Sequence, residues 1–97
     1  MTTAAGATTL RLRLYVAGVA PNSLRAIANA EAVCAKYFRD DHELEVVDLM
    51  AEPTRAAHDR IIVTPTLIKL APAPEQRVIG DLSDAAQLLI ALGRAPA

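Results

Sequence analysis

The chain has 97 residues, of which 53% are hydrophobic and 22% charged, and its formal net charge is −1. This length suits one domain with one core, and the charge lacks the basic bias that binding to a phosphate backbone requires. No apolar run approaches the roughly 20 residues of a membrane-spanning helix, and the N-terminus lacks a basic flank followed by an apolar segment. The composition therefore predicts a cytoplasmic protein that binds neither nucleic acid nor membrane.

The expected organisation is a disordered N-terminal tail at residues 1–8, a single domain at residues 9–93 and a C-terminal tail at residues 94–97. The only cysteine, Cys34, has no partner for an internal disulfide, which fits a reducing compartment. We interpret Cys34 as a small core residue rather than as a nucleophile.

Residues 9–17 predict a strand, because apolar and polar residues alternate strictly. One face carries Leu10, Leu12, Leu14 and Val16, and the other carries Arg11, Arg13 and Tyr15. A helix is expected to begin at Pro21 and Asn22 and to end near Phe38. Its apolar stripe would consist of Leu24, Ile27, Cys34 and Phe38.

Residues 39–43 read as a polar turn and residues 44–49 as a second strand. A strand, a helix of some sixteen residues and another strand form a βαβ unit, whose crossover requires parallel pairing of the two strands. Residues 51–60 predict a short helix or turn with Pro53 near its first position. The first half of the chain therefore indicates the α/β class.

The second half begins with the apolar run at residues 61–70, which contains Pro65. A rigid turn at 71–76 and a short strand at 77–82 follow, and the two strands should pair antiparallel. Residues 83–93 predict a helix with Ser83 as its cap, Asp84 in its first turn and Gly93 as its terminator.

The predicted order, βαβαββα, is that of a thioredoxin-like fold. In that fold the third strand starts with a proline whose preceding peptide bond is cis, and Thr64-Pro65-Thr66 has this position. Pro65 lacks an N–H for a strand ladder, so it should mark the beginning of the strand rather than its middle.

Thioredoxin-like enzymes place a reactive cysteine at the turn that leads into the first helix. Here that turn, residues 18–23, contains no sulfur, and the hydroxyl of Ser23 is a poor substitute without a paired base. His42, His58 and Cys34 lack any metal-ligand spacing, and residues 40–45 lack the glycine of a calcium loop. Arg11 and Arg13 suggest either a basic patch or ordinary exposed charges on a strand. We therefore expect a binding protein with no cofactor, no metal and no catalytic residues.

Three segments of the chain resemble the KaiB family of circadian clock proteins: "LRLYVAGVAPNSLRAI", "VVDLMAEPTRAAHDRIIVTPTLIKL" and "RVIGDLS". The resemblance spans roughly residues 10–92, with the separated motifs in the family's order. The main alternative to this family is the related thioredoxin-like sensor domain at the N-terminus of the clock-output histidine kinase.

The resemblance implies a non-enzymatic protein that binds the hexameric ATPase KaiC and alters its phosphorylation and ATPase cycle. It also implies a metamorphic protein: a ground state of order βαββααβ, dimeric or tetrameric, and a thioredoxin-like monomer that binds KaiC. Short apolar runs such as residues 61–70 have no firm strand or helix assignment, which supports such ambivalence. Exchange that re-sets X–Pro bonds would be slow.

Carried over by motif, the KaiC contacts would be Arg60, Lys69, Arg77 and Arg25. The residues relevant to fold switching are Pro65, Pro72, Pro74, Ala91 and Gly93. Ala91 stands where the family pattern has Gly, and Gly93 stands shortly after, where the pattern has Asp. Both residues favour the terminal helix, so this chain should lean toward the thioredoxin-like state.

Glu43 and Glu45 lie where cyanobacterial members have neutral or basic residues, including a lysine of the KaiA contact, which argues against KaiA as a partner. Two alternative functions remain open: a related module that serves stress signalling or sensing through another partner, and a degenerate thioredoxin-like redox protein.

Overall fold

The computed structural model describes residues 9–94. The strand β1 (Leu10–Val16) is one of the two inner strands of its four-stranded sheet. β1 pairs in parallel with β2 (His42–Asp48) and antiparallel with β3 (Thr66–Ala71). β4 (Gln76–Ile79) pairs antiparallel with β3, so the strand order is β2-β1-β3-β4. These pairings confirm the predicted βαβ unit and the antiparallel pair. The tail expected at residues 1–8 and, apart from Arg94, the tail expected at residues 94–97 lie outside the described residues.

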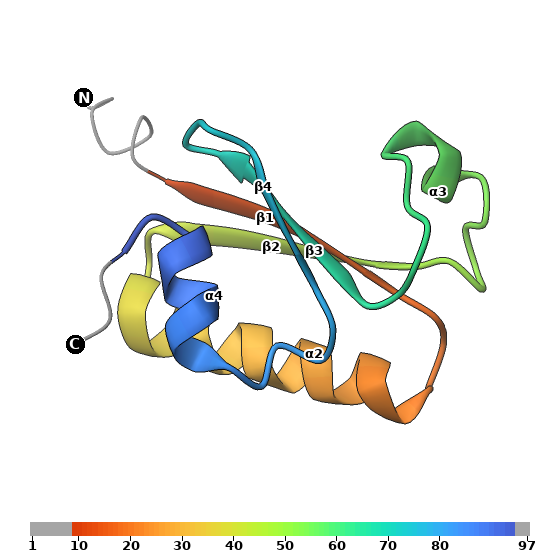
Figure 1. The fold of residues 1–97 in the computed structure, drawn as a ribbon, viewed down its shortest axis with the longest axis horizontal. Helices are drawn as coiled ribbons and strands as arrows, with labels where there is room; N and C mark the ends of the chain where they lie inside the picture. The colour runs from red at the N-terminus through yellow and green to blue at the C-terminus, as the bar shows by residue number, and fades with distance from the viewer. Residues whose placement is uncertain (1–8, 95–97) are drawn as a thin grey trace.

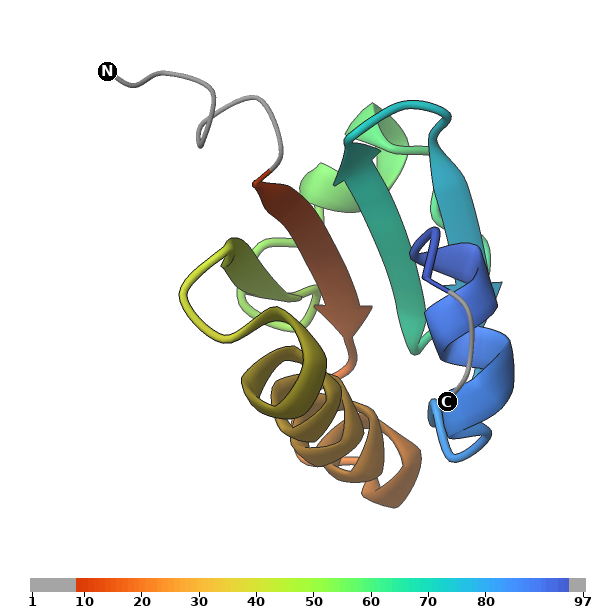
Figure 2. The same cartoon turned by 90° about the vertical axis from the view of Figure 1, so that its left-hand side faces the viewer.

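The helices lie on both sides of this sheet (Figure 1). The helix α2 (Pro21–Val33) continues as the π-helix η1 (Cys34–Phe38), and α4 (Ala85–Ala91) lies beside α2 on the same face. The short helix α3 (Arg55–His58) lies on the other side, as the turned view in Figure 2 also shows. We call these two sides the α2–α4 face and the α3 face. The complete element order confirms the predicted βαβαββα arrangement.

The α2–α4 face carries the larger core because β1 directs a leucine or valine to it at every second position. Ala26 and Ala30 are buried on α2, and their small side chains let the helix approach the sheet closely. The core also includes Leu10, Leu12, Leu14, Val16, Val33, Cys34, Leu67, Leu82, Leu88, Leu89 and Leu92. The core on the α3 face is smaller and consists of Tyr15, Val47 and Ile68, with Leu49, Ile61 and Leu70 packed against it.

The predicted apolar stripe of the first helix is partly wrong. Leu24 is 51% exposed, whereas Ser23 is buried and its Oγ accepts a hydrogen bond from the N–H of Ala17 at 3.0 Å. That bond turns Ser23 toward the sheet and Leu24 away from it. Cys34 is buried, as predicted.

The bounds of two strands differ from the prediction. β2 begins at His42 rather than at residue 44, because the parallel ladder continues until His42 lies opposite Leu10. β4 ends at Ile79 rather than at residue 82, because Gly80 and Leu82 have positive φ angles, +115° and +63°, that an extended strand does not contain.

The cap of the last helix is also different from the prediction. Asp84, not Ser83, is the N-cap residue, since its Oδ1 accepts a hydrogen bond from the N–H of Gln87 at 3.0 Å. The N–H of Ser83 donates instead to Asp81 at 3.0 Å. Gly93 has a φ of +87°, which confirms it as the terminator.

Pro65 lies directly before β3, and its peptide bond with Thr64 is cis, which confirms the position predicted for it. The bonds that precede Pro72 and Pro74, between β3 and β4, are also cis.

Candidate binding surface on the α3 face

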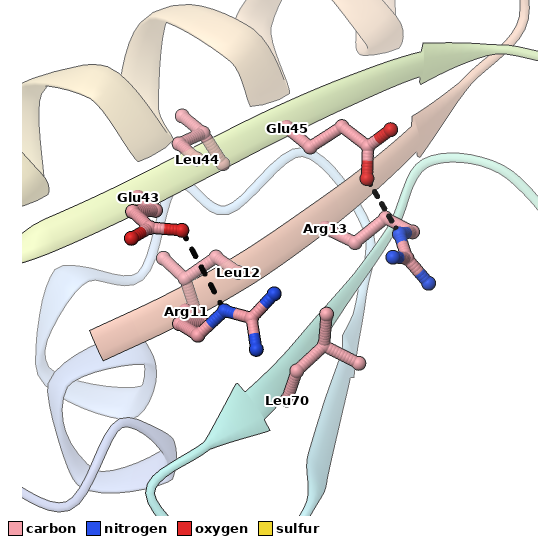
Figure 3. Close-up of a pocket in the computed structure, with 7 residues that line it drawn as sticks. All are labelled: Arg11, Leu12, Arg13, Glu43, Leu44, Glu45 and Leu70. Carbon is pink, nitrogen blue, oxygen red and sulfur yellow. Dashed lines mark hydrogen bonds and ion pairs between the residues drawn. The ribbon is translucent and has the colours of Figure 1, made fainter. Parts of the chain in front are cut away.

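Paired charges cross the α3 face between β1 and β2. The parallel register places Arg11 opposite Glu43 and Arg13 opposite Glu45. The Nε of Arg11 lies 3.6 Å from Glu43, and that of Arg13 lies 2.8 Å from Glu45. Figure 3 shows both pairs beside Leu70, around a shallow cavity of about 260 Å³. Since each arginine faces a carboxylate, the two do not form the basic patch considered from the sequence.

Asp59 connects the chain after α3 to this face of the sheet. Its Oδ2 accepts hydrogen bonds from the hydroxyl of Tyr15 at 2.5 Å and from Nη1 of Arg13 at 2.9 Å. Tyr15 is fully buried, so its hydroxyl requires a partner inside the protein. Ile61 packs against Tyr15 two residues later. One carboxylate and one isoleucine therefore hold the segment that follows α3.

The charges in this network shift one another's pKa values. Burial alone would raise the pKa of Asp59, but the hydrogen bonds from Tyr15 and Arg13 lower it overall. The hydrogen bond from Arg13 likewise lowers the pKa of Glu45, to which Arg55 also donates, at 3.2 Å. Burial raises the pKa of Tyr15. The network therefore holds both carboxylates ionised and Tyr15 protonated at neutral pH.

An apolar groove of about 320 Å³ lies between this anchored segment and β4. Its exposed apolar side chains are Ile62 (93% exposed), Ile79 (68%) and Val63 (44%). Arg60 and Arg77 lie among its lining residues, with Ile61 and Thr66. Arg60 makes no ion pair with any side chain of residues 9–94, whereas Arg77 makes one with Glu75 at 3.5 Å. Exposed apolar side chains next to arginines are typical of a protein-binding surface.

The structure separates the four predicted contact residues. Arg60 and Arg77 line the same groove. Lys69 points to the α2–α4 face, is only 4% exposed and lies near Gly93. Arg25 lies on α2, where it contacts Asn22 and pairs with Asp81 at 3.3 Å.

The turn that would hold a redox cysteine is closed by hydrogen bonds. Ser23 binds the N–H of Ala17, and Oδ1 of Asp48 accepts from the N–H of Gly18 at 2.9 Å. Cys34 lies in the core, where burial and, to a lesser extent, Glu31 raise its pKa to about 11. A thiol with that pKa is protonated at neutral pH and is a weak nucleophile.

Within residues 9–94, no three His, Cys, Asp or Glu side chains come together as a set that would hold a metal ion. No helix in this part of the chain has the length and apolar character to cross a membrane.

Sequence reasoning missed Asp59 and the exposed Ile62 and Ile79. The signal for Asp59 was the strand pattern itself, which places Tyr15 and Arg13 on one face and so requires a polar partner for both. No local signal marked Ile62 or Ile79, because both lie in apolar runs that read as buried strands.

The fold and the closed turn define a thioredoxin-like protein without a redox cysteine. The family model described as "KaiB domain" matches residues 13–94. "Circadian clock protein KaiB3" of Synechocystis is 42% identical over 85 residues, which cover 88% of this chain and 83% of the relative. "Circadian clock oscillator protein KaiB" of Parasynechococcus marenigrum is 46% identical over 81 residues, or 84% and 78% of the two chains. The chain belongs to the KaiB family of circadian clock proteins.

Solved structures agree with this fold. The N-terminal domain of SasA from Synechococcus elongatus superposes with a TM-score of 0.70 at 26% identity, covering 86% of this chain and 81% of the domain. Chloroplastic thioredoxin z gives a TM-score of 0.71 at 24% identity over 89% and 77% of the two chains, a likeness of fold alone.

Proposed function

We propose that this chain binds a KaiC-type hexameric ATPase and thereby modulates its phosphorylation and ATPase cycle, without chemistry of its own. Membership of the KaiB family supports this function. The observation that carries it is the groove on the α3 face, where Arg60 and Arg77 lie among exposed Ile62, Ile79 and Val63. Apolar contacts supply affinity in such a surface, and charges at its rim supply orientation and rate of association.

The absence of catalysis is part of the proposal. The turn at residues 18–23 contains no cysteine, and Cys34 is buried with a raised pKa. A degenerate redox protein is the alternative, and an insulin-reduction assay separates the two. We expect no turnover above buffer, whereas thiol-dependent turnover would favour the redox alternative.

We further propose that the chain exchanges slowly with a second, oligomeric packing, and that Ala91 and Gly93 favour the fold described here. Ala91 ends α4, and Ala is favoured over Gly inside a helix by roughly 0.5–1 kcal/mol. Gly93 adopts the positive φ of a helix terminator. A solution NMR spectrum should show this fold, and a tetramer of the other packing as the only species would contradict the proposal.

The proposal does not include KaiA. Glu43 and Glu45 lie on the edge strand β2, and both are already paired with arginines of β1. A sensing or stress-signalling role through another partner is the second candidate, and the chain is similar in fold to the N-terminal domain of SasA, the related domain considered from the sequence. Failure to bind any KaiC-type ATPase would favour that role.

The groove is tested by the variant Arg60→Glu, whose charge reversal should weaken binding to the KaiC-type ATPase about tenfold or more while leaving the fold intact. Lys36→Glu is the matched control, because Lys36 is exposed and does not line the groove. Affinity and thermal midpoint are measured for both. Equal affinities for wild type and Arg60→Glu would remove Arg60 from the binding surface.

A further inference from the structure

A second cavity, of about 530 Å³, lies where η1 meets the end of α4. In Figure 1 these two helix ends lie together on the left, whereas α3 lies on the right. The cavity is therefore remote from the groove. Its lining residues are Lys36, Tyr37, Phe38, Arg39, Asp41 and Arg94.

The positive charge of this cavity is only partly neutralised by the side chains of residues 9–94. Five of the ten lysines and arginines make ion pairs with carboxylates: Arg11, Arg13, Arg25, Arg55 and Arg77. The other five make none within residues 9–94, and three of those five line this one cavity. Clustered like charges repel one another and so favour a bound anion.

Two aromatic rings lie close to two of the three cations, Lys36 and Arg94. The guanidinium of Arg94 lies 5.6 Å from the ring centre of Phe38 and 5.9 Å from that of Tyr37, and Nζ of Lys36 lies 5.2 Å from Tyr37. Nη1 of Arg94 also donates to the carbonyl of Tyr37 at 2.7 Å. The guanidinium of Arg94 is therefore held by one hydrogen bond and two ring contacts, and donors are left for a ligand because arginine has five N–H groups.

The backbone places these residues through two unusual features. η1 is a π-helix, a form that occurs mostly as short stretches and often at functional sites. Arg39 follows it with a φ of +32°, a value that is uncommon for a residue other than glycine. The N–H of Asp41 then donates to the carbonyl of Phe38 at 2.6 Å, which closes the turn.

We propose that this cavity binds a phosphate dianion, carried by a nucleoside monophosphate or present as free phosphate. Three cations and the single carboxylate of Asp41 leave an excess of two positive charges, which matches a dianion. A guanidinium presents its donors in a fork that fits phosphate oxygens, and its plane stacks on rings such as a base. The volume lies in the range of about 300–1,000 Å³ that small-ligand sites occupy. The site does not depend on the groove or on its partner.

The test is an NMR titration of the full chain at low salt with inorganic phosphate, adenosine monophosphate and adenosine. We expect phosphate and the nucleotide to shift the Tyr37 and Phe38 signals, and adenosine to shift them far less. Tighter binding of the nucleotide than of phosphate would assign the ligand as a nucleotide, and equal binding would assign the phosphate group alone. Adenosine binding as tightly as its monophosphate, or no saturable shift with either anion, would overturn the proposal.

The variants Arg39→Gln and Arg94→Gln should each weaken anion binding about tenfold, the loss expected for a charged hydrogen bond. Two variants are used because the loss of Arg94 could disturb the end of α4, whereas Arg39 does not lie on that helix. Arg11→Gln is the matched control, since Arg11 is exposed but lies on the α3 face. Binding that falls equally in Arg39→Gln and Arg11→Gln would identify diffuse charge attraction and would also overturn the proposal.

Discussion

The two faces of the sheet are stabilised in different ways. The α2–α4 face buries a continuous set of leucines, valines and alanines, whereas the α3 face buries three residues and holds the rest of its covering segment through Asp59. The face held by a few polar contacts leaves Ile62 and Ile79 exposed, so the larger core and the groove proposed for the KaiC-type ATPase lie on opposite sides of one sheet.

The largest effect is expected from Leu14→Ala on the α2–α4 face. Leu14 is fully buried at the centre of β1, and such truncations cost about 2–5 kcal/mol because they remove apolar contacts and leave a cavity. Chemical denaturation measures the loss. A cost below about 1 kcal/mol would contradict the assignment of this face as the main source of stability.

A smaller effect is expected from Tyr15→Phe on the α3 face. The variant keeps the ring in its core but removes the hydrogen bond that the Tyr15 hydroxyl donates to Asp59. We expect a cost of about 1–3 kcal/mol. Because Asp59 anchors the groove wall, amide exchange at residues 60–64 should accelerate more than exchange in α2. Equal acceleration in both segments would show a general loss of stability instead.

Acidification should lower the free energy of unfolding through groups on the α3 face. The loss should be smaller than the loss caused by removing the Tyr15 hydroxyl. The pKa values of Asp59 and Glu45 are lowered in the folded protein, so their contribution is complete above the unfolded pKa values near 4 and is lost as pH falls through the lower folded values. Glu45 is half exposed, and solvent screens its share. Stability measured from pH 6 to pH 3 should fall less steeply in Asp59→Asn than in wild type, and equal slopes would contradict this account.

The smallest effect is expected from Arg11→Gln. Its pair with Glu43 spans 3.6 Å between side chains that are 57% and 68% exposed, and such surface pairs contribute about 0–1 kcal/mol. The free energy of unfolding should therefore stay within about 0.5 kcal/mol of wild type. A larger loss would mean that the charges near Leu70 stabilise the face as strongly as those around Asp59.

The sequence predicted the α2–α4 face better than the α3 face, for a physical reason. Strict alternation in β1 reports burial directly, and the turn before Pro21 marks where the helix begins. The bounds of β4 and the cap at Asp84 were harder to predict from the sequence. A short strand and a seven-residue helix depend on tertiary contacts more than on periodicity.

The residues of the candidate site were also predicted only in part from the sequence. The motif resemblance supplied Arg60 and Arg77, and the structure places both in one groove. Lys69 came from the same resemblance but lies on the buried face, because the two sides of β3 alternate and only the pairing with β1 determines which side is covered. Asp59 is distant in sequence from Tyr15, so their contact required the fold.

The central claim is that the α3 face binds a KaiC-type ATPase. The most direct test is size-exclusion chromatography with light scattering, on the protein alone and after overnight mixing with the KaiC-type hexamer of the same organism. We expect a monomer that co-elutes with the hexamer after mixing, and a smaller co-eluting fraction for Arg60→Glu at the same concentrations. Separate elution of the wild-type protein and the hexamer under every nucleotide and phosphorylation state would contradict the claim.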